Sequence, residues 1–300
     1  MAAHVRRINS QDKIATGILT AIVGLVLLIL AAIVIYILVA GAGKLFDVSF
    51  LTSKPQQVKA GGGIGPELFN SFYLLFLTLV ISVPLSLGAA IYLSQYAPEN
   101  WVTSVAKTII ETLSSLPSIV VGLFGFLFFV LTMGWGFSVI AGAVALTMFN
   151  IPILVRTCQQ ALEDVPRSQR DAGLAMGLTR WETTIHVLLP AAMPAIVTGI
   201  VLSAGRVFGE AAALIFTAGQ SAPVLDFTCF DLSSPSRPWN IFRPAETLAV
   251  HIWKINSEGV VPDLEAISNG TAAVLMVCIL TFNLIARFVG KLLERRLTSE

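Results

Sequence analysis

The feature that most constrains this chain is an unbroken apolar run over residues 14–40, which contains no charged side chain. About 20 apolar residues in a helix cross the roughly 30 Å hydrocarbon core of a bilayer. A secretory signal peptide has an apolar core of only about 7–15 residues, so we interpret this run as a retained anchor helix. Overall, 55% of the residues are hydrophobic and 12% are charged, against about 25% charged in soluble domains. The sequence therefore predicts an integral membrane protein.

Five further apolar segments are long enough to span the bilayer, which gives an all-α fold with six transmembrane helices. They cover residues 68–96, 105–131, 137–157, 185–217 and 270–290. A polar, Gly-rich stretch over 41–67 reads as an external linker. It separates the anchor from a transmembrane domain over 68–290. Residues 1–13 and 291–300 form an N-terminal segment and a C-terminal tail.

Lys and Arg give the orientation, because cytoplasmic loops carry an excess of them. The excess falls on one side when both termini are placed in the cytoplasm. The long loop 158–184 is then cytoplasmic and the long loop 219–268 is external. Loops of this length in a compact domain are usually functional. The external loop is rich in aromatic residues, and it is either a docking surface for an external protein or a folded cap.

Several classes of function find no support in the sequence. The net charge of +1 indicates no nucleic-acid partner. The Cys residues fall on the inner side, on the outer side and within a span, so a disulfide framework is not expected, and the His residues are too scattered to predict a metal site: Cys158, Cys229, Cys278, His4, His186 and His251. No GxxxxGK(S/T) loop is present, so the chain is not expected to bind ATP in that manner.

The cytoplasmic loop contains a short candidate helix after Pro166, a residue that suits the first turn of a helix. Gly173 and Gly177 are four residues apart, which would place them on one helix face. A face of small residues lets another surface approach closely. We therefore expect a short exposed helix that contacts a partner.

The residue spacing here resembles the EAA motif of ABC importer permeases: Glu-Ala-Ala, three residues, Gly, nine residues, then Ile-x-Leu-Pro. Asp171 stands for Glu, Gly173 for the second Ala and Val187 for Ile, and the remaining positions match: Ala172, Gly177, Leu189 and Pro190. The resemblance implies a coupling helix that docks in a groove of a cytoplasmic ATPase subunit. It would transmit closure of the ATPase dimer to the membrane helices.

The fifth apolar segment contains a charged pair, Arg206 and Glu210, four residues apart and so on one helix face. Arg206 lies about 24 Å along the helix from Pro190, in the outer half of the bilayer. Either the two neutralise each other as an internal pair, or they form a polar site on a transport path. Our hypothesis is that Arg206 receives an anion, because its planar fork matches phosphate oxygens. Glu210 would hold Arg206, or an arginine of a partner subunit, and would accept a hydrogen bond from a protonated phosphate oxygen.

Small residues and prolines in the spans predict how the helices pack. Gly205 and Gly209 are four apart and are expected to form a close-packing stripe. Pro117 is expected to kink the third span. Asn150 and Asn283 are expected to bond to neighbouring helices.

Longer stretches resemble the PstA-type phosphate permeases, notably residues 61–66, 111–125 and 205–219. This resemblance implies a type-1 ABC importer (MetI-like) permease core in a bacterial inner membrane, with both termini cytoplasmic. It implies as partners a second homologous permease subunit, a dimer of ATPase subunits that carry the ATP, and an external phosphate-binding protein.

Other functions remain open at this point. The chain could serve another oxyanion, such as molybdate, sulfate or phosphonate. It could be a passive channel or membrane scaffold, although the coupling motif argues against that. A membrane enzyme has no support, because the sequence shows no nucleophile–base pair and no metal cluster.

Overall fold

A computed structural model describes residues 2–56, 60–229, 231, 234–259 and 262–298, and the described chain is all-helical with no strand. The helices are α1 (Ala2–Leu45), α2 (Val48–Thr52), α3 (Gly65–Ile91), α4 (Trp101–Ser114), α5 (Ser118–Gly125), α6 (Val139–Glu163), α7 (Arg167–Ala175), α8 (Arg180–Thr183), α9 (Leu189–Phe208), α10 (Ala212–Thr217), α11 (Leu248–Glu258) and α12 (Leu264–Thr298). Three π-helical stretches continue α3, α5 and α8: η1 (Tyr92–Tyr96), η2 (Phe126–Thr132) and η3 (Thr184–Leu188).

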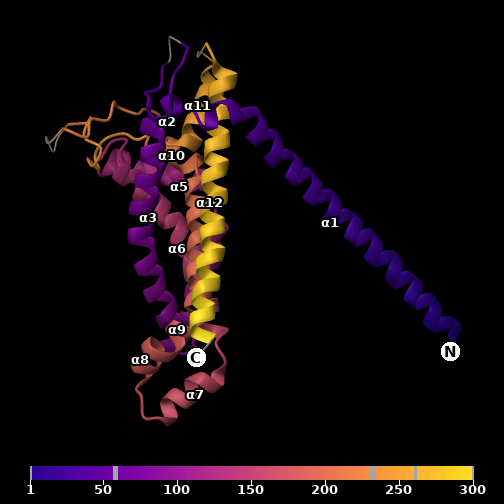
Figure 1. The fold of residues 1–300 in the computed structure, drawn as a ribbon. Helices are drawn as coiled ribbons and strands as arrows, with labels where there is room; N and C mark the ends of the chain where they lie inside the picture. The colour runs from indigo at the N-terminus through magenta and orange to yellow at the C-terminus, as the bar shows by residue number, and fades with distance from the viewer. Residues whose placement is uncertain (1, 57–59, 230, 232–233, 260–261, 299–300) are drawn as a thin grey trace.

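Five of these helical stretches are long and apolar enough to cross a membrane, or six if one bent pair counts as a span. The predicted all-α membrane fold is confirmed. In Figure 1, α3, α6, α9 and α12 run along the bundle, with α7 at one end and α11 at the other. These two ends are called the α7 end and the α11 end below.

Helix α6 lies at the centre of the bundle. Two thirds (67%) of its most apolar window is buried, against 33% or less for the other spans. Small residues on α6 explain its position, because they let neighbouring helices approach closely: Ala141, Gly142, Ala143 and Ala145 are all buried.

Two of the predicted spans are interrupted. The 105–131 segment is broken by a 97° bend between α4 and α5. Pro117 is the N-cap of α5, and a proline disfavours helical backbone in the residue before it, so it separates two helices rather than kinking one. The 185–217 segment also divides, because α9 ends at Phe208 with Gly209 as its C-cap, and α10 is a separate helix.

Helix α1 slants away from the bundle in Figure 1. It is longer than the predicted 14–40 anchor, and its most apolar window is 0% buried. It packs on α12 near the α11 end, where a Cβ on Gly41 would overlap Asn269 and Ala273. A helix that is apolar all round needs lipid or another apolar surface around it. Most of α1 is therefore free to contact lipid or another protein.

The segment before α11 is held to α3 by a buried arginine, Arg243, which is 1% exposed. Its guanidinium donates hydrogen bonds to the Pro238 carbonyl at 3.2 and 3.0 Å, the Pro244 carbonyl at 3.1 Å and Asn70 Oδ1 at 2.7 Å. Burial lowers the pKa of Arg243 to about 10, which leaves it charged at neutral pH. Arg243 therefore holds the predicted external loop 219–268, called the cap below, to α3.

The aromatic residues of the predicted external loop are partly folded onto α3. The Trp239 ring packs edge-on against Phe69, with centroids 5.3 Å apart, and against Tyr73 at 5.5 Å. Phe227, Trp239 and Phe242 nevertheless remain 64%, 58% and 59% exposed. The loop is thus a folded cap that still presents aromatic side chains outward.

Candidate translocation face and coupling segment

Arg206 lies in the last turn of α9 and is exposed in the chain. Its guanidinium carbon is 4.5 Å from the ring centroid of Phe149 on α6, an arrangement in which a cation is attracted to the ring face. Phe149 is ten residues into α6, about 15 Å from the helix end nearest α11. The Arg206 guanidinium therefore contacts an aromatic ring on one face and is otherwise exposed, at a depth well inside the bundle.

Glu210 does not share a helix face with Arg206, and that prediction is wrong because α9 ends at Phe208. No ion pair within 4.0 Å joins the two in the described part of the chain. Instead, Glu210 Oε1 accepts a hydrogen bond from the backbone N–H of Ala213 at 3.4 Å, at the start of α10. The guanidinium of Arg206 is thus free of its expected partner.

A buried polar network joins α3, α6 and α9, the last being the helix that carries Arg206. Asn150 of α6 donates to Ser82 Oγ of α3 at 3.1 Å and accepts from the Ser203 hydroxyl of α9. All three side chains are at most 5% exposed, so the helix crossing is fixed by bonds that water cannot replace. The prediction for Asn150 is confirmed. That for Asn283 is wrong, because its amide bonds to Ile279 O of its own helix at 2.9 Å.

Close helix packing occurs away from the predicted stripe. A Cβ on Gly205 would lie 3.9 Å from Ile279, and one on Gly209 would lie 3.6 Å from it, which are ordinary contacts. By contrast, a Cβ on Gly122 of α5 would lie 2.7 Å from the Cα of Ala213 on α10. Gly122, in a stretch that carries the family resemblance, therefore lets α5 and α10 approach closely, and Gly199 does the same for α9 and α6, where a Cβ would overlap Thr157.

The predicted cytoplasmic helix is α7, which carries Asp171 and Ala172, both exposed. It ends in a Schellman motif: Leu178 N–H donates to Gly173 O at 3.2 Å, and Gly177 N–H donates to Leu174 O at 3.0 Å. Gly177 has φ +86°, a left-handed conformation that glycine adopts without a steric penalty. Gly177 therefore sets the turn after the helix.

Gly173 faces its own chain. It is buried, and a Cβ there would lie 2.9 Å from Cγ2 of Thr183. The expectation that Gly173 and Gly177 share a partner-facing surface is wrong, because α7 ends at Ala175 before reaching Gly177. Gly173 instead seats α7 against the stretch that leads into α9.

That stretch connects α7 to the bundle through α8 and η3. Thr179 and Glu182 form a capping box at the start of α8. Leu189 and Pro190 then follow η3 without a break, since Leu189 N–H still donates to Thr184 O, and Arg180–Phe208 is one helical stretch. Around them lies an apolar cluster from α3, α6 and α9: Ala90, Cys158, Ala161, Leu162, Leu188, Ala192 and Ile196. The stretch after α7 therefore packs against α3 and α6.

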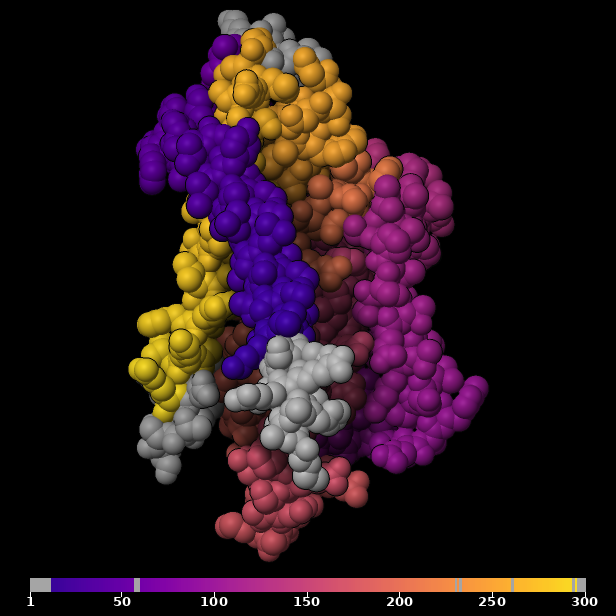
Figure 2. Space-filling view, turned by 90° about the vertical axis from the view of Figure 1, so that its right-hand side faces the viewer, coloured from indigo at the N-terminus to yellow at the C-terminus, as the bar shows by residue number. Residues whose placement is uncertain are grey.

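The α7 end presents apolar side chains to solvent. Leu174, Met176 and Trp181 are 39%, 84% and 57% exposed. In Figure 2 this segment protrudes beyond the rest of the molecule. Exposed apolar groups gathered on a protruding element are typical of a protein interface.

Residues 82–299 match the family described as "Binding-protein-dependent transport system inner membrane component". The chain is 50% identical over 288 residues to a probable ABC transporter permease protein, YqgI, of Bacillus subtilis, covering 96% of this chain and 98% of the relative. It is 34% identical over 246 residues to the phosphate transport system permease protein PstA of Yersinia pestis, covering 80% and 76%. The resemblance to PstA-type permeases is confirmed.

The fold also matches a solved structure, the inward-facing MetNI methionine ABC transporter. The TM-score is 0.58 at 18% sequence identity, and the match covers 77% of this chain and 94% of that one. The MetI-like permease core is therefore confirmed as the fold. The chain belongs to the family of binding-protein-dependent transport system inner membrane components, and it is a multi-pass permease subunit of an ABC transporter.

Proposed function

We propose that this chain is the permease subunit of an ATP-driven importer of inorganic phosphate, forming half of the translocation path. The observation that supports the proposal best is Arg206, an exposed cation within the bundle with no carboxylate partner in the described chain. A charge at that depth costs about 2.5–3.5 kcal/mol on insertion scales and normally lines an aqueous path. The PstA relative is named for phosphate.

The chemistry of Arg206 suits an oxyanion. A guanidinium has a planar fork of N–H donors, which forms paired hydrogen bonds with phosphate oxygens. Phe149 supports one face of the guanidinium, and its N–H groups pair with no carboxylate among the described residues, which leaves them for the anion. Glu210, which is only partly buried, accepts a hydrogen bond from a phosphate oxygen that still carries its proton.

Coupling to ATP hydrolysis runs through α7. The exposed Leu174, Met176 and Trp181 seat in a groove of a cytoplasmic ATPase subunit, so the α7 end faces the cytoplasm and both termini lie there. ATP binding closes the ATPase dimer, displaces α7 and opens the bundle outward. Hydrolysis then resets it. ATP stays on the partner subunits.

Two further partners complete the transporter. A second homologous permease supplies the other half of the path and covers the apolar surface of α1 that is bare in the single chain. An external phosphate-binding protein delivers the anion to the cap and docks on its exposed aromatic residues, including Phe227 and Trp239. The membrane is the bacterial inner membrane.

Competition between oxyanions tests the substrate. We expect labelled phosphate uptake by cells that depend on this chain to fall with excess unlabelled phosphate and to persist with equal sulfate or molybdate. Sulfate and molybdate carry no proton at neutral pH, so neither can donate to Glu210. Equal inhibition by all three, or selective inhibition by molybdate, would contradict phosphate as the substrate. Deletion of the chain gives the background rate.

A further inference from the structure

A second cluster of ionisable side chains lies at the α11 end, away from Arg206. Glu67 comes from the first turn of α3, Glu246 precedes α11, and His251 lies on α11. They are 0%, 2% and 5% exposed. Acidic residues are almost never fully buried unless they are paired, so the cluster needs a physical explanation.

The internal bonds of the cluster leave part of it unsatisfied. Glu246 is used on both oxygens: Oε1 pairs with His251 Nδ1 at 2.7 Å, and Oε2 pairs with Lys254 Nζ at 3.1 Å. Both carboxylate oxygens of Glu67 and Nε2 of His251 are buried without a hydrogen-bond partner. A buried polar group with no partner costs free energy, and it commonly marks a bound ion or water.

The geometry suits a small cation. One ligand atom from each of Glu67, Glu246 and His251 lies within 4.8 Å of the others. Oxygen and nitrogen ligands bind tetrahedral zinc at about 2.0–2.2 Å, so any two of them lie about 3.4 Å apart. Side-chain movements of less than about 1 Å would therefore close the three around an ion.

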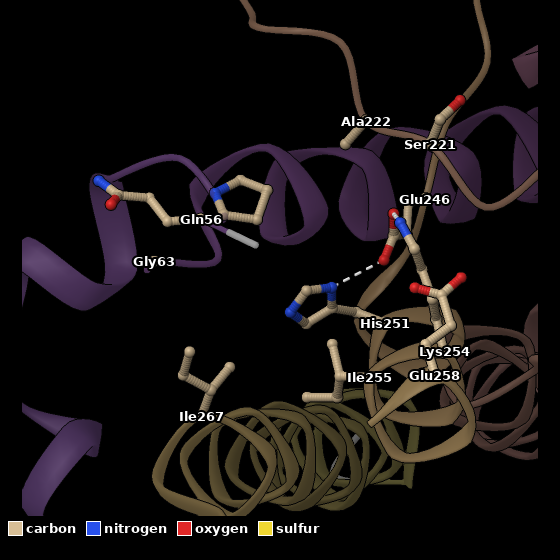
Figure 3. Close-up of a pocket in the computed structure, with 11 residues that line it drawn as sticks. Gln56, Gly63, Ser221, Ala222, Glu246, His251, Lys254, Ile255, Glu258 and Ile267 are labelled. Carbon is tan, nitrogen blue, oxygen red and sulfur yellow. Dashed lines mark hydrogen bonds and ion pairs between the residues drawn. The ribbon is translucent and has the colours of Figure 1, made fainter. Parts of the chain in front are cut away.

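The cluster also has an access route. A cavity of about 380 Å³ adjoins it and is lined by Glu246, His251, Lys254 and Glu258, among others. In Figure 3, one ring nitrogen of His251 faces Glu246, and the other is turned away from it. The cavity gives an ion a way in and leaves room for water as a further ligand.

We propose that Glu67, Glu246 and His251 bind a divalent transition-metal cation of the Zn²⁺ type. Imidazole with carboxylates is a ligand set for such ions, whereas Ca²⁺ and Mg²⁺ favour oxygen alone. Two carboxylates exclude an anion here. Lys254, on the same element as His251, competes for Glu246, and it keeps a second bond to Gln220 O at 2.7 Å when the ion binds. The ion ties the cap to the start of α3.

Zinc binding to the full-length chain tests the site. The chain is purified from membranes in detergent and stripped with a chelator, and Zn²⁺ is then titrated while bound metal and the melting temperature are measured. The variants are Glu67→Gln and His251→Gln, which retain size and hydrogen-bonding capacity. The control is Glu258→Gln, which lines the same cavity but is not a proposed ligand.

We expect the wild type and Glu258→Gln to bind Zn²⁺ with equal affinity and to melt at a higher temperature when it is present. Each ligand variant should lose at least about tenfold in affinity, as is typical when a metal site is disturbed, along with the rise in melting temperature. The proposal is overturned if the wild type binds no Zn²⁺, or if both ligand variants bind it as the wild type does.

Discussion

Replacing Arg206 with Ala is expected to lower phosphate uptake by about 10- to 100-fold, because a hydrogen bond to a charged group contributes about 1.5–3 kcal/mol. The buried network of Ser82, Asn150 and Ser203, which joins α9 to its neighbours, does not use the Arg206 side chain. The variant should therefore fold and assemble. Uptake is measured in cells that depend on the variant chain, with its membrane level determined by immunoblot.

Two matched variants sharpen this prediction. Arg206→Lys keeps the charge but not the planar fork, so it should retain an intermediate rate. Arg156→Ala removes another exposed arginine, one paired at 3.9 Å with Glu111 away from the Arg206 site, and should leave uptake near the wild-type rate. Wild-type uptake by Arg206→Ala at a normal membrane level would remove Arg206 from the path.

The second large effect is expected at the two glycines of the coupling segment. A Val side chain at Gly173 would clash with Thr183, displacing α7 from the stretch that leads into α9. Val at Gly177 would be forced into φ near +86°, which costs about 1–2 kcal/mol for an L-residue. Both changes alter how α7 packs against the stretch that leads into α9. Uptake should therefore fall about tenfold or more while ATP hydrolysis by the assembled complex continues.

The diagnostic quantity is the ratio of phosphate transported to ATP hydrolysed, measured on reconstituted complexes. Gly88→Val is the control, because Gly88 lies on α3 with no atom within 4 Å of its Cβ position. Its ratio should match that of the wild type. An unchanged ratio in both Gly173→Val and Gly177→Val would show that the seat of α7 does not carry the coupling.

The sequence predicts the apolar segments that form the membrane helices and the short helix α7, but not every break within them. Both features depend on local pattern. The membrane helices follow from the length of the apolar segments. The short helix α7 follows from a helix-forming run that ends before Gly177, where the Schellman motif needs a left-handed residue. Pro117 and Gly209 are expected to lie within continuous helices, whereas each lies at a helix end. A proline or glycine inside an apolar run can kink a helix or end it, and tertiary packing decides which.

The remaining features depend on residues that are distant in sequence. Glu67 and His251 meet only because the cap folds back onto α3. The spacing of the histidines in the sequence does not indicate this cluster. Arg243 lies in the predicted external loop, and no local pattern in the sequence indicates that its side chain bonds to Asn70 on α3. Gly173 turned inward because Thr183 packs against α7, a contact that helical spacing alone does not contain.

Phosphate accumulation by the purified complex in liposomes decides the central proposal. The complex is isolated through this chain and reconstituted, with ATP on the α7 side and loaded phosphate-binding protein on the other. We predict that labelled phosphate is concentrated against its gradient toward the α7 side, and that accumulation stops when a non-hydrolysable ATP analogue replaces ATP. Phosphate that only equilibrates at the same rate without ATP, or that does not move at all, would contradict an ATP-driven phosphate permease.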